Sequence, residues 1–188
     1  MAKSHRHGKC RLAALALVLG LSSSASVGDD EALRISPVRR TTIATADVDA
    51  SLRFYRDLLG FTVEYDVEVT DPEQLSLFQP GATKGRAIAL RRERLGGSIG
   101  LYWTPGLPSP GSCEGPARGG TVSVLLLTDA LDRLQQKLKQ AGVTFLQEAA
   151  QYSASRGPTR AFTVIDPNCV RVAVAQIENE TLEESLAK

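Results

Sequence analysis

The sequence predicts an α+β fold made of two modules, each with the element order βαβββ. Two observations lead to this prediction. A strand followed by an amphipathic helix occurs twice, and Asp47 and Asp129 precede the two helices while Gly60 and Gly142 end them. Both pairs of landmarks are 82 positions apart, which indicates a duplicated unit. The chain of 188 residues should fold as one compact domain containing both copies.

The first module is expected over residues 38–103. Its first strand leads to Asp47, which caps a helix, and Gly60 ends that helix because glycine readily adopts the left-handed conformation. The apolar residues of the helix recur at helical spacing, at Val48, Leu52, Tyr55, Leu58 and Leu59. Three strands should follow, at Phe61–Val69, Arg86–Arg92 and Ser98–Trp103.

The second module is expected over residues 120–177 and repeats this plan. Asp129 is expected to cap its helix, and the apolar stripe is Leu131, Leu134, Leu138 and Ala141. The later strands are expected at Val143–Glu148, Thr159–Ile165 and Val170–Gln176. Residues 104–120, "TPGLPSPGSCEGPARGG", are dense in Pro and Gly and can only link the modules.

The N-terminal residues have the order of a secretory signal peptide. Four basic residues precede the apolar run "LAALALVLGL", and the small residues "SSSAS" follow it. We expect cleavage near Ala25 and a periplasmic or secreted protein. The alternative, a single membrane anchor, needs about 20 apolar residues, more than this run supplies. The expected organisation is a signal peptide (1–25), a linker (26–36), a domain (37–177) and a C-terminal tail (178–188) that could form a short surface helix.

Cleavage would change the chemistry available to the chain. Both histidines, His5 and His7, would be removed, which excludes His-based catalytic triads and the commonest ligand of transition metals. Eighteen basic residues would remain against 21 acidic ones, a net charge of −3, so nucleic acid is not an expected partner. Cys113 and Cys169 would be the remaining thiols, either bridged or free at the surface.

The helix "DVDASLRFYRDLLGF" and the late segment "FTVIDPNCVRVAVAQ" resemble the glyoxalase, bleomycin-resistance and extradiol-dioxygenase superfamily, also called the vicinal oxygen chelate fold. The resemblance covers about Val38 to Gln176. It implies that the paired sheets curl into a half-open mixed β-barrel around a ligand cleft. It also implies that four strands supply His, Glu or Gln ligands to a divalent metal. These positions fall here on Arg40, Gly100, Val122 and Ala173, which cannot bind a metal, so no cofactor is expected.

Strand alternation within the implied cleft predicts the residues that face a ligand. The expected ligand-binding residues are Arg40, Thr42, Tyr102, Val122, Val124, Arg160, Arg171 and Ala173. Ser98, Leu126, Phe162 and Ala175 are expected nearby. An apolar trough with arginines predicts a small apolar, anionic ligand. The arginines could instead lie on a solvated sheet face, and Tyr102 and Phe162 could instead pack in the core.

Three functions remain open from the sequence. The first is a ligand-binding or sequestering domain without a catalytic residue. The second is a lyase or isomerase that works without metal and uses Tyr102, Glu64 or Asp66 as acid or base. The third is a non-catalytic module that binds a partner protein. A small-molecule ligand is the expected partner, a homodimer is possible, and no membrane anchor should persist after cleavage.

Overall fold

The computed structural model describes residues 36, 38–92, 97–113 and 115–187. The expected signal peptide and most of the linker after it lie outside the described residues, so export stays a prediction. Within the described ranges, no helix is long and apolar enough to cross a membrane.

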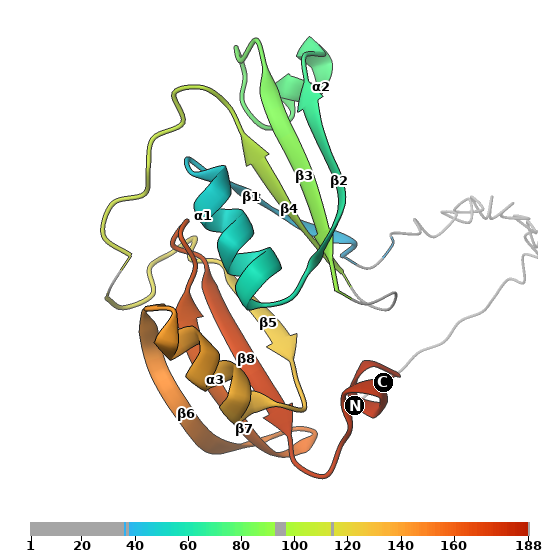
Figure 1. Cartoon of the computed structure of the whole chain (residues 1–188), viewed down its shortest axis with the longest axis vertical. Helices are drawn as coiled ribbons and strands as arrows, with labels where there is room; N and C mark the ends of the chain where they lie inside the picture. Colours follow the sequence, from blue (N-terminus) through green and yellow to red (C-terminus); the bar gives the residue numbers. More distant parts are fainter. Residues whose placement is uncertain (1–35, 37, 93–96, 114, 188) are drawn as a thin grey trace, which may run out of the picture. The chain divides into compact units, whose positions relative to one another are not determined.

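The first module forms a four-stranded sheet with the strand order β1-β4-β3-β2, in which β1 runs parallel to β4 (Figure 1). Its elements in chain order are β1 (Arg40–Ala44), α1 (Val48–Leu52), η1 (Arg53–Leu58), β2 (Thr62–Val69), α2 (Pro72–Ser76), β3 (Gly85–Arg91) and β4 (Ser98–Trp103). Element η1 continues α1 as a π-helical turn, with the Leu59 amide donating to the Phe54 carbonyl at 3.0 Å.

The second module forms a matching sheet with the order β5-β8-β7-β6, and β5 runs parallel to β8. Its elements are β5 (Ser123–Leu127), α3 (Leu131–Gln140), β6 (Phe145–Ala154), β7 (Gly157–Ile165) and β8 (Arg171–Ile177), followed by α4 (Leu182–Ala187). The predicted pair of βαβββ modules is therefore confirmed. Among the described strands, hydrogen bonding forms two separate sheets and not one closed barrel.

Most element predictions agree with the structure, and three differ. Helix α2 was not predicted, although Asp71 caps it and Pro72 occupies its first turn, a combination typical of helix starts. Strand β6 extends six residues beyond the expected end at Glu148. Asp129 does not cap α3, because the N-cap position is Ala130, which has no side chain that could cap the helix. Asp47 does cap α1, accepting a hydrogen bond from the Ala50 amide at 2.9 Å.

The shifted cap changes the correspondence between the modules by one residue. In the first sheet β1 begins with Arg40, which lies opposite Ser98 of β4. In the second sheet β5 begins with Ser123, which lies opposite Arg171 of β8. Arg40 therefore corresponds to Ser123, and not to the expected Val122. The offset is 83 positions at the strands and 82 at the helix stops Gly60 and Gly142, both of which have positive φ angles.

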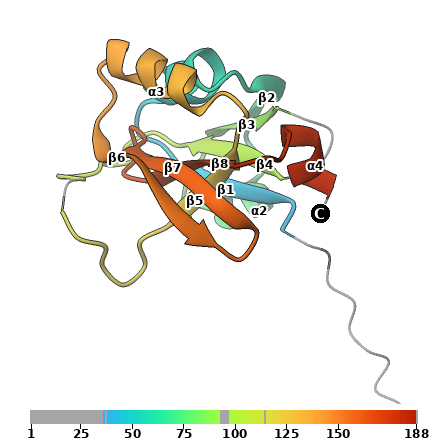
Figure 2. The ribbon, with the colours of Figure 1, turned by 90° about the horizontal axis from the view of Figure 1, so that it is seen from below.

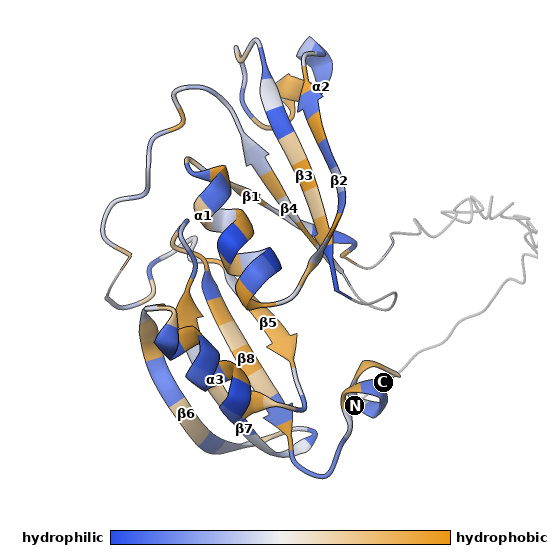
Figure 3. Ribbon diagram, viewed as in Figure 1, coloured by the Kyte–Doolittle hydropathy of each residue, from blue (hydrophilic) through white to orange (hydrophobic). Residues whose placement is uncertain are grey.

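The core lies between each sheet and the helix that packs on it. Figure 2 shows α3 on one side of the sheet that contains β7 and β8, and in Figure 3 apolar residues line β5 and β8 while polar ones cover α3. Tyr55, Phe162, Val172 and Val174 are fully buried. Phe162 thus packs in the core, which was the stated alternative to a cleft position.

Among the described residues, side chains of both modules share one hydrophobic core, and polar contacts also join the modules. Lys137 on α3 donates 2.8 Å hydrogen bonds to the carbonyl oxygens of Asp57 and Leu58, at the end of η1. The Tyr55 hydroxyl reaches Asp166, in the turn between β7 and β8. Finally, Cys113 in the linker forms a disulfide with Cys169 in that same turn, which decides between the two states expected for these thiols.

Candidate functional site

The open face of the first sheet holds a cavity of about 450 Å³, which we call the Arg40 cavity. Strands β1, β2, β3 and β4 form its floor, and the segment around α2 covers one side. Its principal lining residues are Arg40, Thr42, Tyr65, Leu77, Phe78 and Tyr102. A volume of this size is in the range of small-molecule sites.

The Arg40 guanidinium is held by neutral partners. Its Nε donates to the Ser98 hydroxyl at 3.1 Å, and its Nη1 donates to the Tyr65 hydroxyl. The guanidinium carbon lies 5.2 Å from the centre of the Tyr65 ring, within the range of a cation–π contact. None of the ion pairs found among the described residues includes Arg40. Its positive charge therefore remains available to an anion.

Gly100 on β4 makes room for this arginine. A Cβ atom at position 100 would lie 2.9 Å from Cδ of Arg40 and 2.8 Å from the Thr42 hydroxyl oxygen, closer than real contacts allow. The arginine side chain therefore lies across the strand at a position where only glycine fits without displacement.

The walls of the Arg40 cavity are aromatic and aliphatic. The rings of Phe78 and Tyr102 are stacked with their centroids 4.5 Å apart. Val67, Leu77 and Phe78 are exposed although they are large and apolar, which suits a surface that a ligand would cover. The Tyr102 hydroxyl is buried without a hydrogen-bond partner, and burial raises its pKa.

Three of the predicted binding residues come together in this cavity, namely Arg40, Thr42 and Tyr102. Sequence reasoning missed Tyr65, Leu77 and Phe78; the last two directly follow helix α2, which was not predicted. The "DP" signal at residues 71–72 could have revealed that helix.

The other predicted residues lie elsewhere. Arg160 is on the face of the second sheet that α3 covers, and it pairs with Asp132 of α3 at 2.7 Å. Arg171 donates to the Gly115 carbonyl in the linker at 2.7 Å. Val122 precedes β5 and is half exposed, and Ala173 is partly buried on β8. None of these four lines the Arg40 cavity.

Val124 was expected to share a face with Ala173, and the strand register corrects this expectation. Leu125 lies opposite Ala173, so Val124 projects to the other side of the sheet. There it packs against the core that includes Val172 and Val174. The error has the same origin as that at Asp129, a slip of one residue in the second module.

The sequence model of the Glyoxalase/Bleomycin resistance protein/Dioxygenase superfamily matches residues 38–174. The chain belongs to this superfamily. The sequence matches none of the curated proteins.

Solved structures of the superfamily share the fold. A glyoxalase family protein from Bacillus cereus superposes with a TM-score of 0.66 at 13% identity, covering 78% of this chain and 97% of that one. A trypanothione-dependent glyoxalase I from Leishmania major gives a TM-score of 0.53 at 18% identity, with coverage of 76% and 87%. A glyoxalase family protein from Enterococcus faecalis gives 0.52 at 14% identity, with coverage of 74% and 97%.

The metal that the superfamily implies does not fit the residues present. The four positions of the ligand set are occupied by Arg40, Gly100, Ala173 and, with the corrected register, Ser123. No imidazole or carboxylate stands at any of them, and the Arg40 side chain would repel a cation. Among the residues that the structure describes, no group of three His, Cys, Asp or Glu side chains could hold a metal ion.

We therefore predict that the purified mature protein retains no tightly bound transition metal. Elemental analysis after dialysis should find substoichiometric zinc, nickel, iron and manganese. One equivalent of any of these metals surviving dialysis would contradict the prediction.

Proposed function

We propose that this superfamily member is an exported, metal-free domain that binds or sequesters a small apolar acid in the Arg40 cavity. The observation that carries the proposal is the placement of Arg40, a cation held by Ser98 and Tyr65 beside exposed aromatic and aliphatic walls. The Cys113–Cys169 disulfide supports export, because disulfides persist in oxidising compartments.

The expected affinity comes from two contributions. A carboxylate bound by a guanidinium gains a charge-assisted hydrogen bond worth about 1.5–3 kcal/mol. Apolar surface covered by the walls adds about 25 cal/mol per Å². Because immobilising a ligand costs several kcal/mol, neither contribution is sufficient alone. A flat aromatic acid that contacts Phe78 while its carboxylate reaches Arg40 would use both.

Thermal-shift and calorimetric titrations with small aromatic and aliphatic acids, compared with their methyl esters, test the proposal. We predict that acids stabilise the protein more than esters and that Arg40→Ala weakens acid binding at least about tenfold, the equivalent of 1.4 kcal/mol. Arg160→Ala is the matched control, because it removes a guanidinium that pairs with Asp132 outside the cavity. Equal binding of acids and esters, or acid binding unchanged by Arg40→Ala, would overturn the proposal.

The alternative of a metal-free lyase or isomerase has less support. Glu64 is paired with Arg91 at 2.5 Å, and Asp66 forms two hydrogen bonds with Arg86. Arg86 also lowers the pKa of the Asp66 carboxyl, which makes it a weaker base. Both carboxylates are paired with arginines of the sheet, so neither is a free general base with a pKa near neutral pH, as such catalysis needs.

A further inference from the structure

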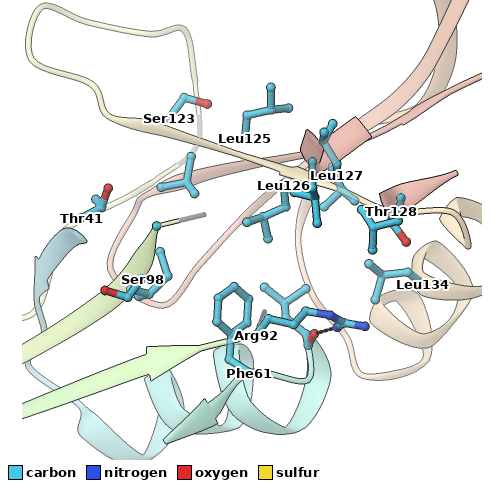
Figure 4. A pocket seen from close by; sticks show the side chains of 17 residues that line it. Thr41, Phe61, Arg92, Ser98, Ser123, Leu125, Leu126, Leu127, Thr128 and Leu134 are labelled. Carbon is cyan, nitrogen blue, oxygen red and sulfur yellow. Dashed lines mark hydrogen bonds between the residues drawn. The ribbon is translucent and has the colours of Figure 1, made fainter. Parts of the chain in front are cut away.

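A second cavity, of about 470 Å³, lies between the two modules and shares no lining residue with the Arg40 cavity. We infer that this inter-module cavity is a binding site for a linear amphiphile with one anionic head, such as a medium-chain fatty acid. Phe61, Arg92, Leu125, Leu126, Leu127 and Leu134 are principal lining residues (Figure 4). The inference does not depend on the proposed function of the Arg40 cavity.

The walls of the inter-module cavity come from both modules and are mostly aliphatic. Figure 4 shows Leu126 of β5 pointing toward Phe61 and Arg92 of the first module, while Leu125 points to the other side of the strand. Strand β5 is an edge strand of its sheet, and Leu125 is 63% exposed. The aliphatic side chains of this wall offer apolar surface that an extended hydrocarbon chain can cover.

Arg92 supplies a positive charge to the inter-module cavity. It is the only charged residue among the described lining residues, and its Nη1 donates to the Leu59 carbonyl. None of the ion pairs of the described residues involves it. A guanidinium has five N–H donors, so several remain for a carboxylate. One cation beside an aliphatic wall is complementary to one anionic head on an apolar chain.

Helix α4 contributes Leu182 and Leu186 to the cavity. These residues are four positions apart and so lie on the same face of the helix. The helix is held by Arg156, which pairs with Glu180 at 2.7 Å and donates to the Ser185 carbonyl at 3.1 Å. The tail expected to be peripheral thus forms part of a cavity wall.

Calorimetric titration of the purified chain with decanoic acid tests the inference, with methyl decanoate as the neutral comparison and octanoic and dodecanoic acids to define chain length. We expect decanoic acid to bind and the ester to bind at least about tenfold more weakly. Arg92→Ala should weaken decanoic acid about tenfold, and Arg92→Lys, which keeps the charge, should weaken it less. Arg160→Ala is the matched control and should leave decanoic acid binding unchanged, because its guanidinium pairs with Asp132 outside both cavities.

A nitroxide-labelled fatty acid locates the chain independently of Arg92. Paramagnetic broadening of the methyl signals of Leu126, Leu182 and Leu186 is expected, with those of Leu77 unaffected. Absence of binding, equal binding of acid and ester, or decanoic acid binding left unchanged by Arg92→Ala would overturn the inference. Binding of small aromatic acids should be weakened by Arg40→Ala and not by Arg92→Ala. The two variants therefore show separately whether the Arg40 cavity or the inter-module cavity fails to bind its expected ligand.

Discussion

Replacing both Cys113 and Cys169 with Ser is expected to lower the free energy of unfolding by about 4 kcal/mol. The disulfide joins residues 56 positions apart, and the chain-entropy treatment gives about this value for a loop of that length. The effect should be large because the linker has no helix or strand of its own between β4 and β5 in its described residues. Chemical denaturation of the oxidised wild type, the reduced wild type and the double variant is the measurement.

The backbone at Cys169 supplies a control for this experiment. Its φ angle is +66°, in the left-handed region that residues other than glycine seldom adopt. In a chain that already carries Cys113→Ser, Cys169→Gly should therefore be about 1 kcal/mol more stable than Cys169→Ser. Reduced wild type should match the double-serine variant within experimental error. If all of these forms unfold at the same denaturant concentration as the oxidised protein, the bridge does not stabilise the fold.

Local signals in the sequence were sufficient for the order of the elements, whereas the arrangement of the two sheets was implied by the resemblance to the superfamily. Asp47 and Gly60 each act within one helical turn, so their roles could be predicted without knowledge of the rest of the chain. The start of α3 was missed by one residue because Asp129 has the right residue type but the wrong backbone position. The carboxylate of Asp129 makes no cap hydrogen bond in the structure, and the sequence contains no signal that predicts this.

Only the part of the candidate site that lies on the regularly paired strands β1 and β4 could be predicted from the sequence. Thr42 lies opposite Gly100, and the adjacent pair on the same face is Ala44 and Tyr102, so alternation alone places Arg40, Thr42 and Tyr102 together. Arg160 was misplaced because its pairing with Asp132 joins a strand to a helix, a tertiary contact without a local signal. The same holds for the proximity of Cys113 and Cys169, whose Cα atoms are 4.9 Å apart.

Asp166 is the centre of a buried hydrogen-bond network between the modules. Its side chain accepts from the Tyr55 hydroxyl at 2.9 Å, from the Asn168 backbone and side-chain amides at 2.8 and 3.1 Å, and from the Val170 amide at 2.7 Å. Asn168 also donates to the Ser51 hydroxyl on α1 at 3.0 Å. Asp166 is 2% exposed, so water cannot replace these partners.

Asp166→Ala is expected to destabilise the protein by about 3 kcal/mol, because it leaves the buried Tyr55 hydroxyl and two partly buried backbone amides without acceptors. Tyr55→Phe should cost only about 1 kcal/mol, since the carboxylate keeps its other donors. In a double-mutant cycle measured by denaturant unfolding, Tyr55→Phe should cost less in the Asp166→Ala background than in wild type. Additive effects would show that the two groups do not interact energetically.

The pH dependence gives an independent test of this contact. Burial, with the neighbouring Asp166 charge and hydrogen bond, raises the pKa of Tyr55 well above its ordinary value of 10.0. The folded protein therefore holds this proton more tightly than the unfolded chain does, and the stabilisation is complete below pH 10 and is lost as the pH rises above it. Each pH unit in that range should cost wild type about 1.4 kcal/mol more than Tyr55→Phe. Parallel alkaline unfolding curves for the two proteins would mean that Tyr55 ionises as readily in the folded chain as in the unfolded one.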